Sequence, residues 1–494
     1  MSQSDRPNIL IFMTDHQRGD TVLPEHPCIT PNLDRLAGEG VTFTNVFCPS
    51  PHCCPARATF QTGVYPSRHG VWNNICNEQR LSRGLKPGVR TFGEDMAGAG
   101  YDLAWSGKWH VSIDEGPGDR GWRELFVSAA KGTLHGQRWD QIREQAAKTP
   151  DEPVGRGEGQ ILRPGYGTYT TYRGTDDKGN AHDEKTVAEA IGALPRLAGG
   201  GKPWGLYVGC VAPHDPYSVP QRFLDMYDID DVPLPPSHAD TLEDKPRIYR
   251  RMRDMRWGQL TDREVREAIR HFWAYCTYLD DLFGKVLAAL EETGQADNTL
   301  VVYCSDHADY CGDHGLFAKG IPCFRGAYHV PAVVRWPAGI ARPGRRVDEF
   351  VSSADFAPTF TELAGKEPDP ELTGKSLVPF LHGRTPHDWR QELHTQCNGV
   401  ELYYTQRSVM TRDWKYVFNG FDDDELYDLR SDPHEMVNVA ADPANDPVIR
   451  DMCRRMWRFA RREADTCPNG YITVALAPYG PMEAFREGPP EARE

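Results

Sequence analysis

Residues 7–13 read Pro-Asn-Ile-Leu-Ile-Phe-Met and are followed directly by Thr14, Asp15, His16 and Gln17. A continuous apolar run of this length between polar flanks predicts a strand buried on both faces, as in a parallel sheet. In open α/β sheets, ligands gather beyond the carboxyl ends of such strands. The Asp15 carboxylate and the His16 imidazole therefore stand where a metal ion could bind, although Asp15 alone could equally cap a turn.

An apolar run followed by titratable residues recurs along the chain. Predicted strands at 101–106, 203–211 and 299–304 precede further candidate site residues, and these are Lys108, His110, His214, Asp306 and His307, with Lys319 a little later. Because the carboxyl ends of parallel strands share one edge of a sheet, these groups are expected to meet there. Each one alone would also fit a plain role, such as a solvated lysine or an incidental histidine.

Strands alternate with helices up to about residue 385, which predicts one α/β domain over residues 1–385. Its large central sheet is expected to be mostly parallel and flanked by helices. Further strands are predicted at 41–47 and 332–336, and helices at 31–36 (with Thr30 as its cap), after the cysteines through 62, and at 91–98, 183–197, 261–294 and 354–364. Residues 111–182 are polar, rich in glycine and show little periodicity, so a long insertion is expected there.

The pattern changes after residue 385, and residues 386–494 are predicted to form a smaller α+β domain. Short strands at 401–404, 407–411, 415–419 and 425–429, divided by turn residues, predict an antiparallel sheet. The amphipathic stretch 448–464 predicts a helix that packs on this sheet. Residues 467–494 are rich in Pro, Gly and Glu and are expected to form an extended tail with a disordered end. That tail could cover its own cleft or a neighbouring subunit, so a homo-oligomer stays open.

The composition of the 494-residue chain narrows its partners. A net charge of -15 at pH 7 argues against nucleic acid and against anionic membranes. No apolar stretch is long enough for a signal peptide or a membrane span. The thirteen cysteines are scattered and odd in number, which fits reduced thiols better than a disulfide framework. We therefore expect a cytoplasmic protein, unless a leader has been removed.

Residues 51–63, Pro-His-Cys-Cys-Pro-Ala-Arg-Ala-Thr-Phe-Gln-Thr-Gly, place two cysteines before a predicted helix. Pro55 suits the first turn of a helix. Cys53 would then lie at the positive end of that helix, where an electron-rich group is stabilised. Arg57, one turn further on, adds a cation whose donors suit a tetrahedral oxyanion. The alternative is a structural cysteine pair, because cysteine is usually a small buried hydrophobe.

Taken in order, these motifs resemble those of the type I, formylglycine-dependent sulfatases of the alkaline phosphatase superfamily, over nearly the whole chain. One such motif is weak, whereas the ordered set is specific. The matching segments are Thr14-Asp15, Cys53 to Arg57 with Thr62-Gly63, Gly107 to His110, Pro213 to Pro216, Ser305 to His307, Gly312 to Leu316 with Lys319, and, in the C-terminal region, Glu425 to Leu429 and Asp432 to Glu435.

The resemblance implies hydrolysis of a sulfate ester, carried by a sulfated carbohydrate or a small organic molecule. Cys53 would be oxidised to formylglycine by a formylglycine-generating enzyme, and a hydroxyl of the hydrated aldehyde would attack sulfur. Lys108 and Lys319 would hold the sulfate oxygens, and Arg57 would support the formylglycine. His214, together with Lys319, would act on the leaving oxygen.

The resemblance also implies that His110 removes a proton from the second hydroxyl of the hydrate, so that sulfate is expelled. One divalent metal ion would be held by Asp15, His16, Asp306 and His307. Many sulfatases have a second aspartate at the position of His16 and an asparagine at that of His307. Oxygen ligands suit Ca²⁺, the first candidate by family habit, and imidazoles shift the preference towards Mn²⁺, the second. His16 could instead support a ligand without touching the ion.

Two alternatives stay open at this point. Phosphonate monoester and phosphodiester hydrolases of the same superfamily also use formylglycine, and the pair Asp306-His307 fits them equally well. A homologue of another class would be catalytically inactive and would only bind anionic glycans. The presence of Cys53 together with every implied partner speaks against that second alternative.

Overall fold

A computed structural model describes residues 6–129, 131–134, 139–148, 155–176, 178–399, 402–466, 468 and 471–487. Its centre is a nine-stranded sheet in the order β12-β2-β11-β10-β1-β8-β3-β4, with β13 pairing on β2. All neighbours run parallel except β11, which is antiparallel to β10 and β2. The strands are β1 Asn8–Thr14, β2 Val41–Phe47, β3 Asp102–Lys108, β4 Arg123–Ser128, β8 Trp204–Gly209, β10 Thr299–Ser305, β11 His329–Arg335, β12 Arg345–Val347 and β13 Val351–Ser352.

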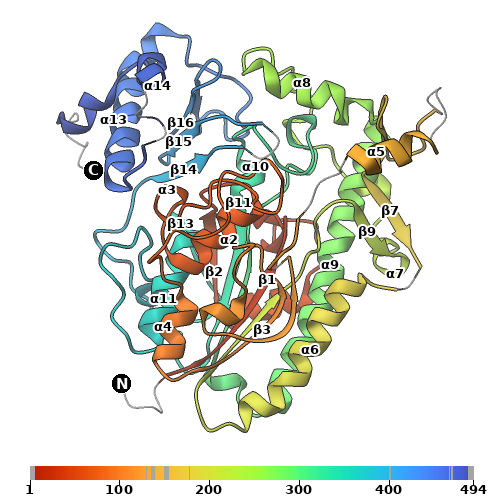
Figure 1. The fold of residues 1–494 in the computed structure, drawn as a ribbon, viewed down its shortest axis with the longest axis vertical. Coiled ribbons are helices and arrows are strands. Elements are labelled where there is room, and N and C mark those ends of the chain that lie inside the picture. Colours follow the sequence, from red (N-terminus) through yellow and green to blue (C-terminus); the bar gives the residue numbers. More distant parts are fainter. Residues whose placement is uncertain are drawn as a thin grey trace.

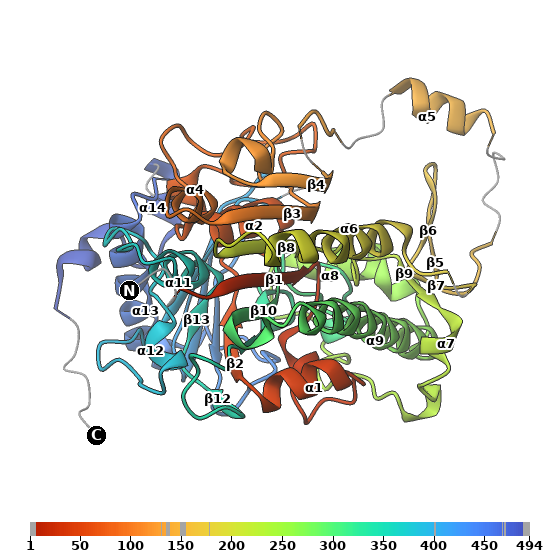
Figure 2. The same ribbon diagram turned by 90° about the horizontal axis from the view of Figure 1, so that it is seen from below.

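Helices cover both faces of this sheet, as the sequence predicts for an α/β domain. Figure 2 shows α6 and α9 on one side and α2, α4 and α11 on the other. The helices are α1 Pro31–Gly38, α2 Cys53–Thr62, α3 Pro66–His69, α4 Phe92–Gly98, α6 Ala181–Ala198, α7 Gln221–Leu224, α8 Arg247–Met255, α9 Asp262–Glu292, α10 Arg325–Tyr328, α11 Phe356–Leu363 and α12 Val378–Leu381. Helix α9 begins with the reciprocal bonds between Thr261 and Glu264 that define a capping box.

The register of the sheet brings the carboxyl ends of its central strands level with one another. Thr14 at the end of β1 lies opposite Ser305 at the end of β10, and Gly107 in β3 lies opposite Gly209 in β8. Gly107 has a φ of 108°, and a Cβ there would come within 2.1 Å of the Gly209 carbonyl oxygen. Only glycine allows β3 to approach β8 so closely, and this approach delivers Lys108 to the common edge.

The predicted insertion at 111–182 is more regular than its sequence suggests. It contains β4, which extends the central sheet next to β3. It also contains α5 Trp139–Ala146, the hairpin of β5 Gln160–Arg163 and β6 Gly167–Thr170, and β7 Tyr172–Thr175, which pairs with β9 Tyr217–Pro220. These strands are short and held by partners distant in sequence, so no periodicity announces them.

The C-terminal region forms the predicted antiparallel sheet with a helix beside it (Figure 1). Its order is β14-β15-β16-β17, with β14 Leu393–Cys397, β15 Gln406–Met410, β16 Trp414–Asn419 and β17 Glu425–Asp428. The prediction of a strand at 401–404 was wrong for residues 402–404, which belong to no strand. Glu401 lies outside the described residues. The edge strand is instead β14, whose sequence Leu-His-Thr-Gln-Cys carries too little apolar alternation to be recognised. Helix α13 Asp446–Arg462 packs on β15 and β16.

The tail was expected to be extended, and this was wrong for its described part. The single turn Pro481–Phe485 packs against α13. Val474 of helix α14 Tyr471–Leu476 packs on the apolar cluster that α13 shares with the antiparallel sheet. Glu483 is buried and accepts hydrogen bonds from Arg450 and Arg454 of α13. The arginine-rich face of α13 therefore binds its own chain's tail. The end at 488–494, for which disorder was expected, lies outside the described residues.

Helix α1 has its N-terminus capped from another helix. Thr30 occupies the cap position, as predicted, but its side chain makes no capping hydrogen bond. The Asp280 carboxylate of α9 accepts instead from the backbone nitrogens of Asn32, at 3.0 Å, and Leu33, at 2.8 Å. Burial raises the pKa of Asp280 to about 6. This buried carboxylate replaces the local cap and joins two helices.

Replacement of Asp280 by alanine is expected to lower the free energy of unfolding by about 2–3 kcal/mol, because buried N–H donors of α1 lose their acceptor. The neighbouring variant Asp281→Ala is the control, since its ion pair among the described residues is the exposed one with Lys285. That control should cost less than about 0.5 kcal/mol. Denaturant unfolding of the two variants beside the wild type measures both values, and equal losses would contradict the capping role.

Candidate active site

The candidate site lies where the central strands end. Asp15 and His16 follow β1, Asp306 and His307 follow β10, and Lys108 closes β3. The sequence predicts that these groups converge, and the structure confirms this, because side chains from all three strands are in direct contact. Asp15, His16, Asp306 and His307 are buried to 1% exposure or less.

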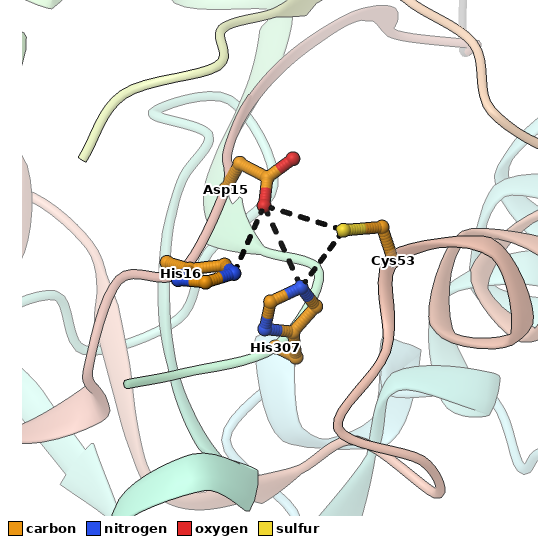
Figure 3. A group of neighbouring side chains, drawn as sticks. All are labelled: Asp15, His16, Cys53 and His307. Atoms are coloured by element: carbon orange, nitrogen blue, oxygen red, sulfur yellow. Dashed lines mark hydrogen bonds and ion pairs between the residues drawn. The ribbon is translucent and has the colours of Figure 1, made fainter. Parts of the chain in front are cut away.

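Cys53 is the first residue of α2. Its side chain faces Asp15 and His307, which follow the ends of β1 and β10 (Figure 3). Its Sγ atom lies 3.2 Å from His307 Nε2 and 3.6 Å from Asp15 Oδ1. His52 precedes the helix without a capping side chain, so the positive end of the helix dipole acts on residue 53. The predicted placement of Cys53 at a helix N-terminus is confirmed.

Arg57 and Lys108 balance the charge of the buried carboxylates. Arg57 donates from Nε to Asp306 at 2.7 Å and from Nη2 to Asp15 at 3.2 Å, and Lys108 donates to the same Asp15 oxygen. Arg57 Nη1 also donates to the Tyr207 hydroxyl and to the Lys108 carbonyl. Burial alone would raise the pKa of Asp15, but Lys108 and Arg57 outweigh it and hold that pKa below its usual range.

Lys319 links Cys53 to two histidines, the buried His16 and the partly exposed His214. Its Nζ atom lies 3.4 Å from Cys53 Sγ and 3.4 Å from His214 Nε2, and it also contacts His16 Nε2. The rings of His16 and His214 stack with centroids 4.0 Å apart. The His214 side chain is 36% exposed, so solvent and ligands reach the site past this residue.

His110 completes the group around residue 53. Burial and the Lys108 charge lower the pKa of His110, but hydrogen bonding to the thiols of Cys53 and Cys76 raises it above its usual value overall. For Cys53 itself, burial raises the pKa of the thiol, and the positive charges of Lys108 and Lys319 reverse this and lower it strongly. The surroundings of residue 53 therefore stabilise negative charge.

The structure brings all the predicted site residues into one connected group, and it adds two aspartates that the sequence reasoning missed. Asp309 Oδ2 lies 3.2 Å from His16 Nδ1 and accepts from the Tyr217 hydroxyl at 2.9 Å. Asp215 Oδ1 lies 3.2 Å from His214 Nδ1, and Tyr169 donates to its other oxygen. Each carboxylate orients the imidazole it faces. Asp309 lies close to His307 in the sequence, and Asp215 directly follows His214. This proximity was the sequence signal that could have identified both aspartates.

The donor atoms fit a divalent metal ion. Single atoms of Asp15, His16, Cys53 and His307 all lie within 4.8 Å of one another, and carboxylate oxygen and imidazole nitrogen are ordinary ligands for divalent ions. The predicted ligand Asp306 is not in this group of four. Its Oδ2 accepts from Arg57 and its Oδ1 from the His307 backbone nitrogen, although Oδ1 remains 3.7 Å from His307 Nε2.

Comparison with known proteins agrees with this geometry. The sulfatase family model matches residues 7–366, and the model of the C-terminal region of N-sulphoglucosamine sulphohydrolase matches residues 312–462. A choline-sulfatase of Rhizobium meliloti (strain 1021) is 30% identical over 490 residues, which are 92% of this chain and 87% of that protein. A multifunctional alkaline phosphatase superfamily protein of Trinickia caryophylli is 29% identical, over 93% of this chain and 96% of that protein.

Among solved structures, the phosphonate monoester hydrolase of Agrobacterium radiobacter superposes with a TM-score of 0.74 at 25% identity, covering 93% of this chain and 96% of that one. The mostly parallel sheet, with the Cys53 group at its edge, defines a hydrolase of the alkaline phosphatase superfamily. Within that class, the chain belongs to the sulfatase family. It is a sulfuric ester hydrolase, and its reaction is the hydrolysis of a sulfate ester.

Proposed function

We propose that this enzyme hydrolyses the sulfate ester of a sulfated carbohydrate or a small organic sulfate, with residue 53 as the nucleophile in its formylglycine form. The observation that carries the proposal is the position of Cys53. It begins α2, and its Sγ atom faces His307, Asp15 and Lys319 within 3.6 Å. When formed, formylglycine supplies a hydrated aldehyde, which offers one hydroxyl for attack and a second for the release of sulfate.

The side chains around residue 53 divide the remaining work. Lys108 and Lys319 bind sulfate oxygens, because both ammonium groups are directed into a buried site where charge is weakly screened. His214 gives a proton to the leaving oxygen from the exposed side of the site. His110 holds a proton taken from residue 53, and a raised pKa of its imidazole favours this role. Arg57 fixes Asp15 and Asp306 in place.

We propose one divalent metal ion held by Asp15, His16, His307 and Asp306, where it would offset the negative charge of the sulfate group. Ca²⁺ remains the first candidate by resemblance to the family. The two imidazoles in the donor set support Mn²⁺ as the second. Elemental analysis of protein purified without chelator distinguishes the two ions.

Conversion of Cys53 requires a formylglycine-generating enzyme as a partner. The described cysteines form no disulfide with one another, which supports the reducing cytoplasm as the proposed location. Within the part of the chain that the structure describes, no helix combines the length and apolar character needed to cross a membrane. Peptide mass spectrometry over residues 51–57 tests the conversion directly.

The runner-up activity is hydrolysis of phosphonate monoesters or phosphodiesters, which the likeness to the phosphonate monoester hydrolase favours. We expect kcat/KM for 4-nitrophenyl sulfate to exceed that for bis(4-nitrophenyl) phosphate and for phenyl 4-nitrophenyl phosphonate by at least about tenfold. Parallel initial-rate measurements on one batch of converted enzyme check this. If the sulfate ester is the poorest of the three substrates, the runner-up replaces the proposal.

A further inference from the structure

A cavity of about 410 Å³ adjoins the catalytic group on the side of His214. His214 and Asp215 form one wall, and Arg173, Lys178, Asn180 and Ser218 contribute to the rest. Lys319 Nζ is 3.4 Å from both Cys53 Sγ and His214 Nε2. The ammonium group of Lys319 therefore bridges His214 and residue 53. In an in-line displacement the leaving group departs on the side opposite the nucleophile. His214 is the residue proposed to protonate the leaving oxygen, and it lines this cavity.

The fold builds the basic wall of this cavity from two distant segments. β7 pairs in parallel with β9, the strand that directly follows His214 and Asp215, and the register sets Arg173 opposite Ser218. Arg173 Nε donates to Ser218 Oγ at 2.9 Å, which orients its guanidinium. Lys178 lies just before α6, two residues from its N-cap residue Asn180 in the chain. The insertion therefore carries its cations to the mouth of the active site.

The charge of this wall is not neutralised within the cavity. No carboxylate among the described residues lies within ion-pair distance of Arg173, and Lys178 meets only Asp176, at 3.6 Å, with both side chains largely exposed. The carboxylate that lines the cavity, Asp215, is already engaged by His214 and by the Tyr169 hydroxyl. A local excess of positive charge in a chain of net charge -15 attracts anions to this cavity.

We infer that this cavity is a subsite for a second anionic group on the leaving alcohol, read by Arg173 and Lys178. The inference rests on the proposed function and narrows its substrate class to sulfate esters whose alcohol also bears a carboxylate or another sulfate. Arg173 is positioned for a charge-assisted hydrogen bond to either group, and Lys178 adds a more mobile charge at the rim. A leaving group that carries a cation is disfavoured by the same two residues.

A matched aryl series tests this subsite. The substrates are phenyl sulfate, 4-carboxyphenyl sulfate and 4-sulfooxyphenyl sulfate, with choline sulfate as the cationic case. We expect wild-type kcat/KM for at least one anionic member to exceed that for phenyl sulfate by about tenfold, and choline sulfate to be the poorest. The carboxylate and sulfate members show which anion is preferred.

In the double variant R173Q/K178Q the preference for the anionic member should fall below about twofold, while phenyl sulfate keeps its rate. K202Q is the control, since Lys202 is an exposed lysine that does not line the cavity. Equal wild-type rates on phenyl sulfate and both anionic substrates, or a preference that survives in the double variant, would overturn the inference. An equal loss of the preference for anionic substrates in K202Q would also overturn the inference, because it would reflect the overall charge of the protein.

If no aryl sulfate is hydrolysed at all, the proposed function fails separately, and binding still tests the subsite. Calorimetry on Cys53→Ala, which cannot turn over substrate by the proposed route, compares phenyl sulfate with 4-carboxyphenyl sulfate and 4-sulfooxyphenyl sulfate. Tighter binding of an anionic compound by about tenfold, lost when Arg173 and Lys178 are both replaced by glutamine, supports the subsite. Equal binding of all three compounds contradicts it.

Discussion

Replacement of Cys53 by alanine is expected to reduce kcat for sulfate ester hydrolysis by about 10⁴-fold or more, because the proposed nucleophile is lost. The fold should persist, since Cys53 begins α2 and alanine suits a helix. Cys53→Ser should be equally inactive: an unconverted serine offers one hydroxyl and lacks the second hydroxyl that releases sulfate. Initial rates on 4-nitrophenyl sulfate test the loss of activity, and circular dichroism tests whether the fold persists.

Cys54→Ala is the matched control for these variants. Cys54 is the adjacent cysteine, and its Sγ accepts from the Ile75 backbone nitrogen, at 3.4 Å. It is fully buried but makes no contact with Asp15, His307 or Lys319 that would place it in the active site. We expect its rate to stay within about threefold of the wild type, with a small loss of stability. Retention of most activity in Cys53→Ala, or an equal loss in Cys54→Ala, would refute the assignment of residue 53 as nucleophile.

Asp15→Asn is expected to produce the second largest effect, a fall in kcat of about 10³-fold together with loss of bound divalent metal. Asp15 Oδ1 faces His307 Nε2 at 3.5 Å, while Oδ2 accepts from Arg57 and Lys108. The amide would remove the proposed negative ligand, and it also leaves the buried cations Arg57 and Lys108 with one carboxylate fewer. Elemental analysis of the purified variant measures the metal independently of turnover.

Asp280→Asn provides the control for this variant. Asp280 is also a buried aspartate, but it caps α1 from α9 and does not belong to the site. It should lose stability and keep its metal content. If Asp15→Asn retains metal at the wild-type level, Asp15 is not a ligand. If both variants lose metal equally, the loss reflects destabilisation of the fold.

The residue spacing predicts much of the site because a parallel sheet fixes where its strand ends lie. Seven candidate residues follow four buried strands, and Thr14 and Ser305 do end level with each other in the sheet. Repeated apolar runs of this kind indicate strands that are buried on both faces, and such strands are typical of a parallel sheet. The carboxyl ends of parallel strands share one edge of the sheet. The predicted convergence of Asp15, Lys108 and His307 is therefore a consequence of topology that the sequence already contains.

Other features depend on contacts that no local pattern encodes. The cap of α1 comes from Asp280, about 250 positions away along the chain, although Thr30 occupies the expected position. The edge strand β14 and the strand β7 are defined by their partners rather than by alternation of their own residues. The tail folds onto α13 because Glu483 meets arginines there, an ion-pair arrangement that composition alone does not reveal.

Residue types at fixed places along the chain were enough to indicate the family and the order in which the candidate site residues follow the strands. They also predict Cys53 as the reactive position, because that prediction depends on the local motif alone. Which atoms of those residues face one another depends on the tertiary structure. It turned one oxygen of Asp306 to Arg57, set Asp309 behind His16 and brought Arg173 beside the cavity next to His214. Such choices follow from packing between segments far apart in sequence, where each side chain has several partners within reach and the whole fold selects one.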